Sequence, residues 1–319
     1  MSLATRERRT CLDCAGAKQT AMLSAGHALV RSVRRRSTRV RCSCLHQAAS
    51  DVPHAEPRAP RSIVASDGTV VPIIMEDDSI VIVDKPANML CVPGSYSNEN
   101  LTSLVAEYVQ PDIRKEQMVV HRLDRHTSGL VVFAKTLDAL KHLHHQLREK
   151  LVDKTYEAVL EGTFDDMMPD DGTWKTVDAA MVRMRRQSPL DQAPALMRIA
   201  NPQDYTDFPS GPAAPKAACT MWRAVPEDAN GRDNAHIGGN TRVELRPVTG
   251  RTHQLRLHMA FLGHPIVGDP WYTTSSVDGT AIPLRPDTEE QFLHLHAKTL
   301  AFEHPASGVR VEAHCVPRF

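Results

Sequence analysis

The side chains best able to do chemistry gather in one short stretch, residues 121–129, which reads HRLDRHTSG. Asp124 lies between Arg122 and Arg125 and comes just before a Thr-Ser-Gly turn. An opposite charge within ~4–6 Å lowers the pKa of a carboxylic acid by about 1–3 units, so these arginines are expected to keep Asp124 ionised. An ionised carboxylate on a rigid turn can act as a nucleophile, for example toward the anomeric carbon of a sugar. An isolated Asp in a turn more commonly caps backbone N–H groups, so this assignment needs support from the rest of the chain.

That support comes from a resemblance carried by four motifs. Residues 121–129 resemble the HRLDxxTSG signature of the RluA-type pseudouridine synthases, and every specified position is met. Residues 76–86, which contain EDD and IVDKP, are similar to the opening strands of that family, and residues 154–156 (KTY) are similar to its K-x-Y element. Residues 249–258 (TGRTHQLRLH), followed by Gly268, Asp269 and Tyr272, resemble its third motif. Four motifs in the family's order are a much more specific signal than any one of them.

The resemblance implies both a fold and a reaction. The implied fold is α+β, the pseudouridine synthase fold, with a bent, mostly antiparallel mixed sheet, flanking helices and a central catalytic cleft. The implied activity is that of an isomerase that breaks the N1–C1′ bond of a uridine in RNA, rotates the uracil and rejoins it through C5. Because uridine inside folded RNA is out of reach, such an enzyme must flip its target base. No metal or other cofactor is expected.

The resemblance also implies roles for individual residues. Asp124 would be the nucleophile, and Tyr156 would stack on the target base and help remove the proton at C5. Arg256 would pair with Asp124, and Arg251 is the second choice for that partner. The expected substrate-binding residues are His121, Arg122, Arg125, Thr127, Arg251 and His253.

Two of these residues also have ordinary structural interpretations. Tyr156 alternates along a strand with Ala158 and Leu160, a pattern that fits plain core as well as a site. Arg256 falls in a helix whose Leu255 and Met259 are expected to point inward, which would direct the arginine toward a cleft or solvent.

Hydrophobic patterning places the motifs on strands and helices. Alternating or continuous apolar runs predict strands, and residues three and four apart predict helices, one of them capped by Thr136. Strands are expected in the stretch 71–84 and at 130–133, 154–160, 217–224, 241–246, 293–302 and 309–315, and helices at 101–108, from 137 onward and at 252–262. Residues 163–240 are rich in Asp, Pro, Gly and Asn, and they are interpreted as a long, partly irregular insertion.

The charge distribution divides the 319-residue chain into unlike regions. Residues 1–50 hold ten basic and two acidic residues, and residues 51–319 hold 28 basic and 36 acidic residues. The excess of basic residues in the first region cancels the excess of acidic residues in the second, so the net charge of the whole chain is zero. This basic, acid-poor stretch is typical of an organellar transit peptide, with plastid ahead of mitochondrion, and it also fits a disordered basic arm of a cytoplasmic or nuclear protein. Residues 51–70 are interpreted as a linker and 71–319 as the catalytic domain. Apolar residues make up 41% of the chain, which excludes global disorder.

Two other functions remain open at this stage. An HxH pair, His294 and His296, with a distant carboxylate such as Asp269, would suit a metal-dependent hydrolase. An RNA-binding module could keep the synthase fold without the activity. The expected partner is ribosomal or transfer RNA. No apolar run is long enough to cross a bilayer, so no membrane partner is expected. The chain is expected to be a monomer.

Overall fold

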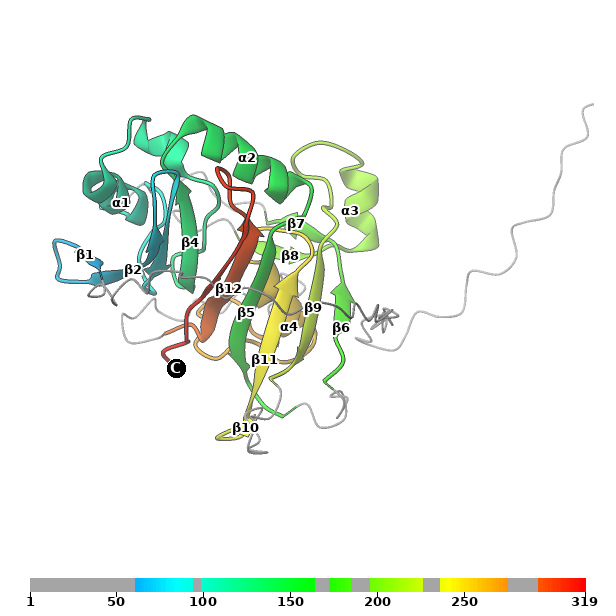
Figure 1. Ribbon diagram of the computed structural model, residues 1–319. Coiled ribbons are helices and arrows are strands. Elements are labelled where there is room, and N and C mark those ends of the chain that lie inside the picture. The colour runs from blue at the N-terminus through cyan, green and yellow to red at the C-terminus, as the bar shows by residue number, and fades with distance from the viewer. Residues whose placement is uncertain (1–60, 94–98, 164–171, 185–195, 226–235, 275–291) are drawn as a thin grey trace, which may run out of the picture.

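The computed structural model describes residues 61–93, 99–163, 172–184, 196–225, 236–274 and 292–319. The chain forms one large sheet and one small one (Figure 1). The large sheet contains β1 (Ser62–Val64), β2 (Val70–Glu76), β3 (Ile80–Lys85), β4 (Ser128–Ala134), β5 (Asp153–Leu160), β6 (Lys175–Asp178), β9 (Cys219–Ala224), β10 (His236–Ile237), β11 (Asn240–Pro247), β12 (Leu295–Glu303) and β13 (Arg310–His314). The small sheet pairs β7 (Met181–Arg183) with β8 (Met197–Ile199). The helices are α1 (Leu101–Val109), α2 (Leu137–Arg148), α3 (Pro202–Asp207) and α4 (Gln254–Phe261), with a 3₁₀ turn η1 at Lys115–Met118.

The large sheet runs in the order β1-β2-β3-β4-β12-β5-β11-β9-β6, with β10 added to β11 and β13 added to β12. Among the strand pairs of the described residues, β4 with β12 is parallel and the others are antiparallel. The expected α+β class with a mixed, mostly antiparallel sheet is therefore confirmed. The parallel pair brings the end of the chain next to the strand that follows Asp124.

The middle of the sheet is buried on both faces. Val81, Val83 and Phe133 belong to one hydrophobic cluster, together with residues of α1 and α4. Ile80 and Val132 belong to a second cluster, together with residues of α2. Helices on both faces explain why β3 and β4 read as continuous apolar runs and not as an alternating pattern.

The linker interpretation of residues 51–70 is wrong at its end. Ser62–Val64 forms strand β1, in which Ile63 is buried and pairs with Val71 of β2. The three prolines that suggested a linker all precede this strand. Val70, the last residue of the segment, already belongs to β2, while residues 51–60 and the whole N-terminal stretch 1–50 lie outside the described residues.

The described part of 163–240 is more regular than its composition predicted. Strands β6, β9 and β10 extend the large sheet, and β7 and β8 form a hairpin over α4. Helix α4 therefore lies between the large sheet and this hairpin, where it contacts β9 and β11 on one side and β8 on the other (Figure 1). Every residue from Gln254 to Ala260 is buried, so α4 is not the amphipathic surface helix that the sequence pattern suggested.

No helix of the described residues combines the length and the apolar character needed to cross a bilayer.

Candidate active site

Asp124 lies in a turn whose backbone is bound by a buried lysine. The ammonium of Lys85, at the end of β3, donates hydrogen bonds to the carbonyl oxygens of Pro86 (2.8 Å), Met89 (2.8 Å) and Arg125 (2.9 Å). Lys85 is fully buried, and this burial lowers the pKa of its ammonium to about 8. The N–H of Leu123 adds a bond to the Cys91 sulfur at 3.3 Å. The backbone on both sides of Asp124 is thus fixed by groups from the preceding strand and its loop.

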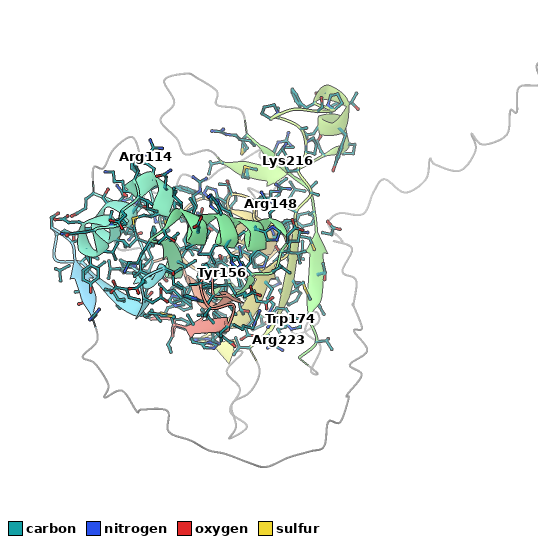
Figure 2. The ribbon with its side chains drawn as sticks, turned by 45° about the horizontal axis from the view of Figure 1, so that its top comes forward. Arg114, Arg148, Tyr156, Trp174, Lys216 and Arg223 are labelled. Atoms are coloured by element: carbon teal, nitrogen blue, oxygen red, sulfur yellow. The ribbon has the colours of Figure 1, made fainter. Side chains whose placement is uncertain are left out.

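A cavity of about 500 Å³ opens over this turn. Tyr156 of β5 lines it, as does Arg148 at the end of α2, and Figure 2 shows how these two side chains lie. Eight of the nine residues expected from the sequence line the cavity, namely His121, Arg122, Asp124, Thr127, Tyr156, Arg251, His253 and Arg256. Arg125 is the exception, because its Nε donates to the carbonyl oxygen of Asn88 (3.3 Å). The sequence motifs, which are up to about 130 residues apart, therefore meet in one place.

Arg256 does not form the ion pair that was expected. Its Nε and Nη2 donate to the two carboxylate oxygens of Asp269 at 2.7 and 2.6 Å, and both side chains are buried. Asp269 also accepts the backbone N–H groups of Trp271 and Tyr272, and the Arg256 guanidinium lies 4.6 Å from the centre of the Trp271 ring. No ion pair joins Arg256 to Asp124 among the described residues. The bidentate geometry that suits Arg is used on Asp269, which leaves Nη1 buried and without a hydrogen-bond partner among these residues.

The electrostatics of Asp124 also differ from the expectation. Burial raises the pKa of Asp124 above its usual range, although the charges of Arg256, Arg122 and Lys85 oppose that rise. The prediction that flanking arginines would lower this pKa is therefore wrong in direction. Desolvation by the cavity walls outweighs cations that are not in direct contact with the carboxylate.

His253 comes closest to Asp124 among the ring nitrogens, with Nε2 4.0 Å from Oδ1. Its Nδ1 is 2.8 Å from the Tyr272 hydroxyl, which accepts the backbone N–H of Met197 on β8 at 3.0 Å. Burial lowers the pKa of His253 to about 3, so the ring is neutral and its approach to Asp124 is not an ion pair at neutral pH. His253 caps α4 with a φ of 55°, in the left-handed region.

Three other expected residues have distinct surroundings. His121 accepts the N–H of Val132 at 3.3 Å, and burial lowers its pKa to about 3, which makes it a neutral support for β4. Arg251 lies exposed at the rim, where its Nε donates to the carbonyl oxygen of Ala217. Thr127 is buried, and its hydroxyl has no hydrogen-bond partner among the described residues.

Sequence reasoning missed several residues of this site. Arg148 and Lys150 line the cavity and were not expected there, and Lys154, which was noted only as part of the KTY motif, lines it too. Lys85 and Asp269 were noted only as parts of motifs, and nothing in their spacing indicates which backbone or guanidinium they bind. Burial raises the pKa of the Tyr156 phenol, which therefore keeps its proton at neutral pH.

Comparison with known proteins shows which family the chain resembles. Residues 79–261 match a family model described as RNA pseudouridylate synthase. The chain is 33% identical to the ribosomal large subunit pseudouridine synthase D of Pseudomonas aeruginosa, over 84% of this chain and 74% of that protein. It is 32% identical to the dual-specificity RNA pseudouridine synthase RluA of Yersinia pestis, over 77% of this chain and 99% of that one.

Among solved structures, the human RNA pseudouridylate synthase domain containing 1 protein is similar, with a TM-score of 0.52 and 27% identity. The similarity covers 77% of this chain and 83% of that one. The matched segment contains Asp124, Tyr156 and Arg256, the residues that meet in the cavity. The shared fold, the ordered motifs and the sequence identity lead to one conclusion: this chain belongs to the RluA-type RNA pseudouridylate synthase family.

Proposed function

We propose that this chain isomerises uridine to pseudouridine in ribosomal RNA, with Asp124 as its catalytic carboxylate. The isomerase activity follows from the family, and the name of the Pseudomonas aeruginosa relative supports the ribosomal large subunit as the source of the substrate. The observation that carries the assignment of the site is the meeting of Asp124, Tyr156 and Arg256 in one cavity. Since all three come from the same chain, a monomer is sufficient.

The cavity suits a single flipped nucleotide. Its volume of about 500 Å³ lies within the ~300–1,000 Å³ of typical small-molecule sites. Flipping a base costs a few kcal/mol of stacking, which an aromatic ring in the cavity can partly return. Tyr156 is the aromatic residue that lines it, so we assign the stacking role to Tyr156.

The chemistry requires an ionised carboxylate beside the ribose. Asp124 would form a bond to C1′ as the N1–C1′ bond breaks, and the released uracil would turn so that C5 faces C1′. C5 would then bond to C1′ as the bond to Asp124 breaks, which restores the carboxylate, and the C5 proton would leave while N1 takes up a proton. The charges of Arg256, Arg122 and Lys85 favour the ionised form. Arg256 Nη1 and the Thr127 hydroxyl are buried without a hydrogen-bond partner among the described residues, so they would bond the uracil or the sugar once substrate binding shifts the cavity wall.

His253 is proposed as a positioning residue for the carboxylate. If the Tyr272 hydroxyl donates to Nδ1, the proton of the neutral ring is on Nε2 and faces Asp124. A neutral donor orients the carboxylate without lowering its basicity as much as a full charge would.

The RNA-binding module and the hydrolase are weaker alternatives. A pure binder has no need for a desolvated carboxylate in the cavity floor. A hydrolase built on His294, His296 and Asp269 is disfavoured because both oxygens of Asp269 are already bound to Arg256.

The first prediction tests the carboxylate. Asp124→Asn should lower the rate of pseudouridine formation at least ~10³-fold, since an amide cannot replace a nucleophilic carboxylate. RNA binding should stay within a few-fold, because no phosphate contact is removed. Tritium release from C5-labelled uridine in a ribosomal transcript measures the rate, and Asp138→Asn on the exposed face of α2 is the control. An unchanged rate would remove Asp124 from the mechanism.

A second prediction concerns pH. Because the pKa of Asp124 is raised and the ionised form is required, kcat/KM should rise with pH through a limb above the usual aspartate range. Arg122→Gln removes a cation that opposes the shift and should move this limb to higher pH. Arg125→Gln is the matched control: Arg125 also flanks Asp124, but its Nε donates to the Asn88 carbonyl, and the limb should not move. An equal shift of the pH limb in the two variants would contradict the assignment of this limb to Asp124.

A third prediction concerns the backbone of the RNA. Arg148 and Lys150 line the cavity beside α2 and are proposed to contact phosphates next to the flipped nucleotide. Replacing both with Ala should raise KM with little change in kcat. The slope of log binding constant against log salt should become shallower by about 1.4, at ~0.7 per single-stranded contact. Lys141→Ala, which removes an exposed lysine of α2 outside the cavity, should leave the slope unchanged.

Residues 1–50 are proposed to carry the chain into an organelle, with plastids ahead of mitochondria. Support comes from the ten basic and two acidic residues of this stretch. A fluorescent protein fused behind residues 1–50 should enter that organelle, and the same fusion with the six arginines between Arg31 and Arg41 changed to Gln should not. Cytosolic or nuclear signal from the unchanged fusion would favour a basic arm.

A further inference from the structure

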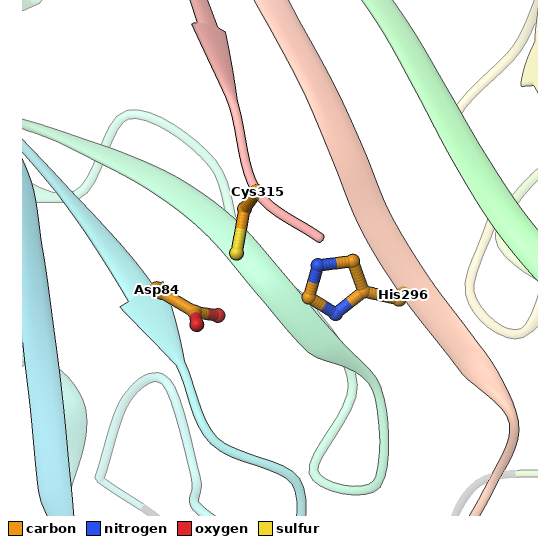
Figure 3. A group of neighbouring side chains, drawn as sticks. All are labelled: Asp84, His296 and Cys315. Carbon is orange, nitrogen blue, oxygen red and sulfur yellow. The ribbon is translucent and has the colours of Figure 1, made fainter. Parts of the chain in front are cut away.

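A second polar cluster lies on the opposite side of the sheet from Lys85 and the Asp124 turn. It consists of Asp84 on β3, His296 on β12 and Cys315 just after β13 (Figure 3). One ligand atom from each of these side chains lies within 4.8 Å of the others. Asp84 and His296 are 5% and 1% exposed, and Cys315 is half-buried. The mechanism proposed above uses none of these groups.

The histidine of this cluster is oriented like a metal ligand. Its Nδ1 lies 2.9 Å from the Ser128 hydroxyl, and Nε2 is buried with no hydrogen-bond partner among the described residues. Figure 3 shows the ring edge on the side of Cys315 and Asp84. When Nδ1 donates its proton to Ser128, Nε2 presents a lone pair to the cluster, the arrangement in which an outer partner fixes the tautomer of a metal-bound imidazole.

From this geometry we propose that Asp84, His296 and Cys315 form a binding site for one zinc ion, with water as the fourth ligand. A carboxylate, an imidazole and a thiolate make a mixed O, N and S set, which zinc accepts in tetrahedral geometry. The ion would join the C-terminal tail to β3 and β12 on the far side of the sheet from Asp124, with the water-bound position left open to solvent. The charges balance, because one thiolate and one carboxylate neutralise the ion.

Two changes must accompany binding. Ligand atoms around zinc lie roughly 3.3–3.6 Å apart, so the cluster must contract by about 1 Å. Cys315 can supply this movement because it follows the last residue of β13 and belongs to the short C-terminal tail. Its thiol must also lose its proton to solvent, since burial raises the pKa of Cys315 to about 12 in the metal-free protein.

Arg318 competes with the metal for Asp84. Its Nη2 lies 2.9 Å from Asp84 Oδ2, but the Arg318 side chain is 65% exposed. Because an exposed arginine can turn into water at little cost, it can vacate the carboxylate and open a path for the ion. This contact also provides a test. If Arg318 only anchors the tail, its removal should weaken metal binding, whereas if Arg318 blocks the metal, its removal should strengthen metal binding.

The test uses the full chain with Cys11, Cys14, Cys42 and Cys44 changed to Ser, so that the N-terminal cysteines do not bind metal. Titration with cobalt(II) chloride should give a near-ultraviolet thiolate-to-cobalt band that saturates at one cobalt per chain. Zinc should displace the cobalt and raise the melting temperature by several degrees. These readouts do not depend on RNA, so failure here would leave the proposed function untouched.

Variants then identify the ligands. Cys315→Ser should abolish the band and weaken cobalt binding at least ~100-fold, the upper end of the effect of losing an outer-shell partner. Cys219→Ser, which removes another partly buried free thiol on β9, is the matched control and should bind as the parent does.

The change in cobalt affinity of Arg318→Ala decides whether Arg318 competes with the ion. If Arg318 competes with the ion, this variant should bind cobalt several-fold more tightly than the parent. Three results would overturn the proposal: no thiolate band in either the parent or Arg318→Ala at millimolar cobalt, a band that persists in Cys315→Ser, or weaker binding in Arg318→Ala.

Discussion

The buried ammonium of Lys85 is the constraint on which the position of Asp124 depends. Three carbonyl oxygens, from Pro86, Met89 and Arg125, converge on its Nζ, so the loop after β3 and the turn before β4 share one cation. A lysine has three N–H donors, and here each finds an acceptor, which makes its burial tolerable. Desolvation still lowers the pKa of Lys85 to about 8, so the charge is present at neutral pH and adds to the cations that favour the ionised form of Asp124.

A second buried charge shapes the opposite wall of the cavity. The ion pair between Arg256 and Asp269 is removed from water, and such pairs are stable only when further hydrogen bonds satisfy the remaining atoms. Asp269 meets this condition through the N–H groups of Trp271 and Tyr272. Arg256 does not meet it in full, since Nη1 has no partner among the described residues. Arg256 is therefore the less completely satisfied partner of this buried ion pair, with its unpaired Nη1 lying beneath the cavity surface.

The sequence predicted the members of the site better than their contacts. The motifs identify Asp124, Tyr156 and Arg256, and the apolar patterning finds most strands, the Thr136 cap and the helix that follows it. The partner of Arg256 could not be predicted, because Asp124 and Asp269 both belong to motifs and only the fold decides which carboxylate the guanidinium reaches. The direction of the Asp124 pKa shift could not be predicted from the sequence either, because desolvation depends on cavity walls that come from distant segments. Within residues 163–240 the pattern finds the strand that becomes β9 but not β7 and β8, because these are three residues each and too short for a periodic signal.

Contacts on both faces of the sheet converge on the strand that follows Asp124. On one face, Lys85 holds the carbonyl of Arg125, while on the other face the Ser128 hydroxyl contacts His296. Gly129, the residue after Ser128, has a φ of 108°, and a Cβ there would lie 2.5 Å from the backbone of Ala297. Only glycine permits this approach of β4 to β12, the parallel pair that joins the last part of the chain to the strand after the Asp124 turn.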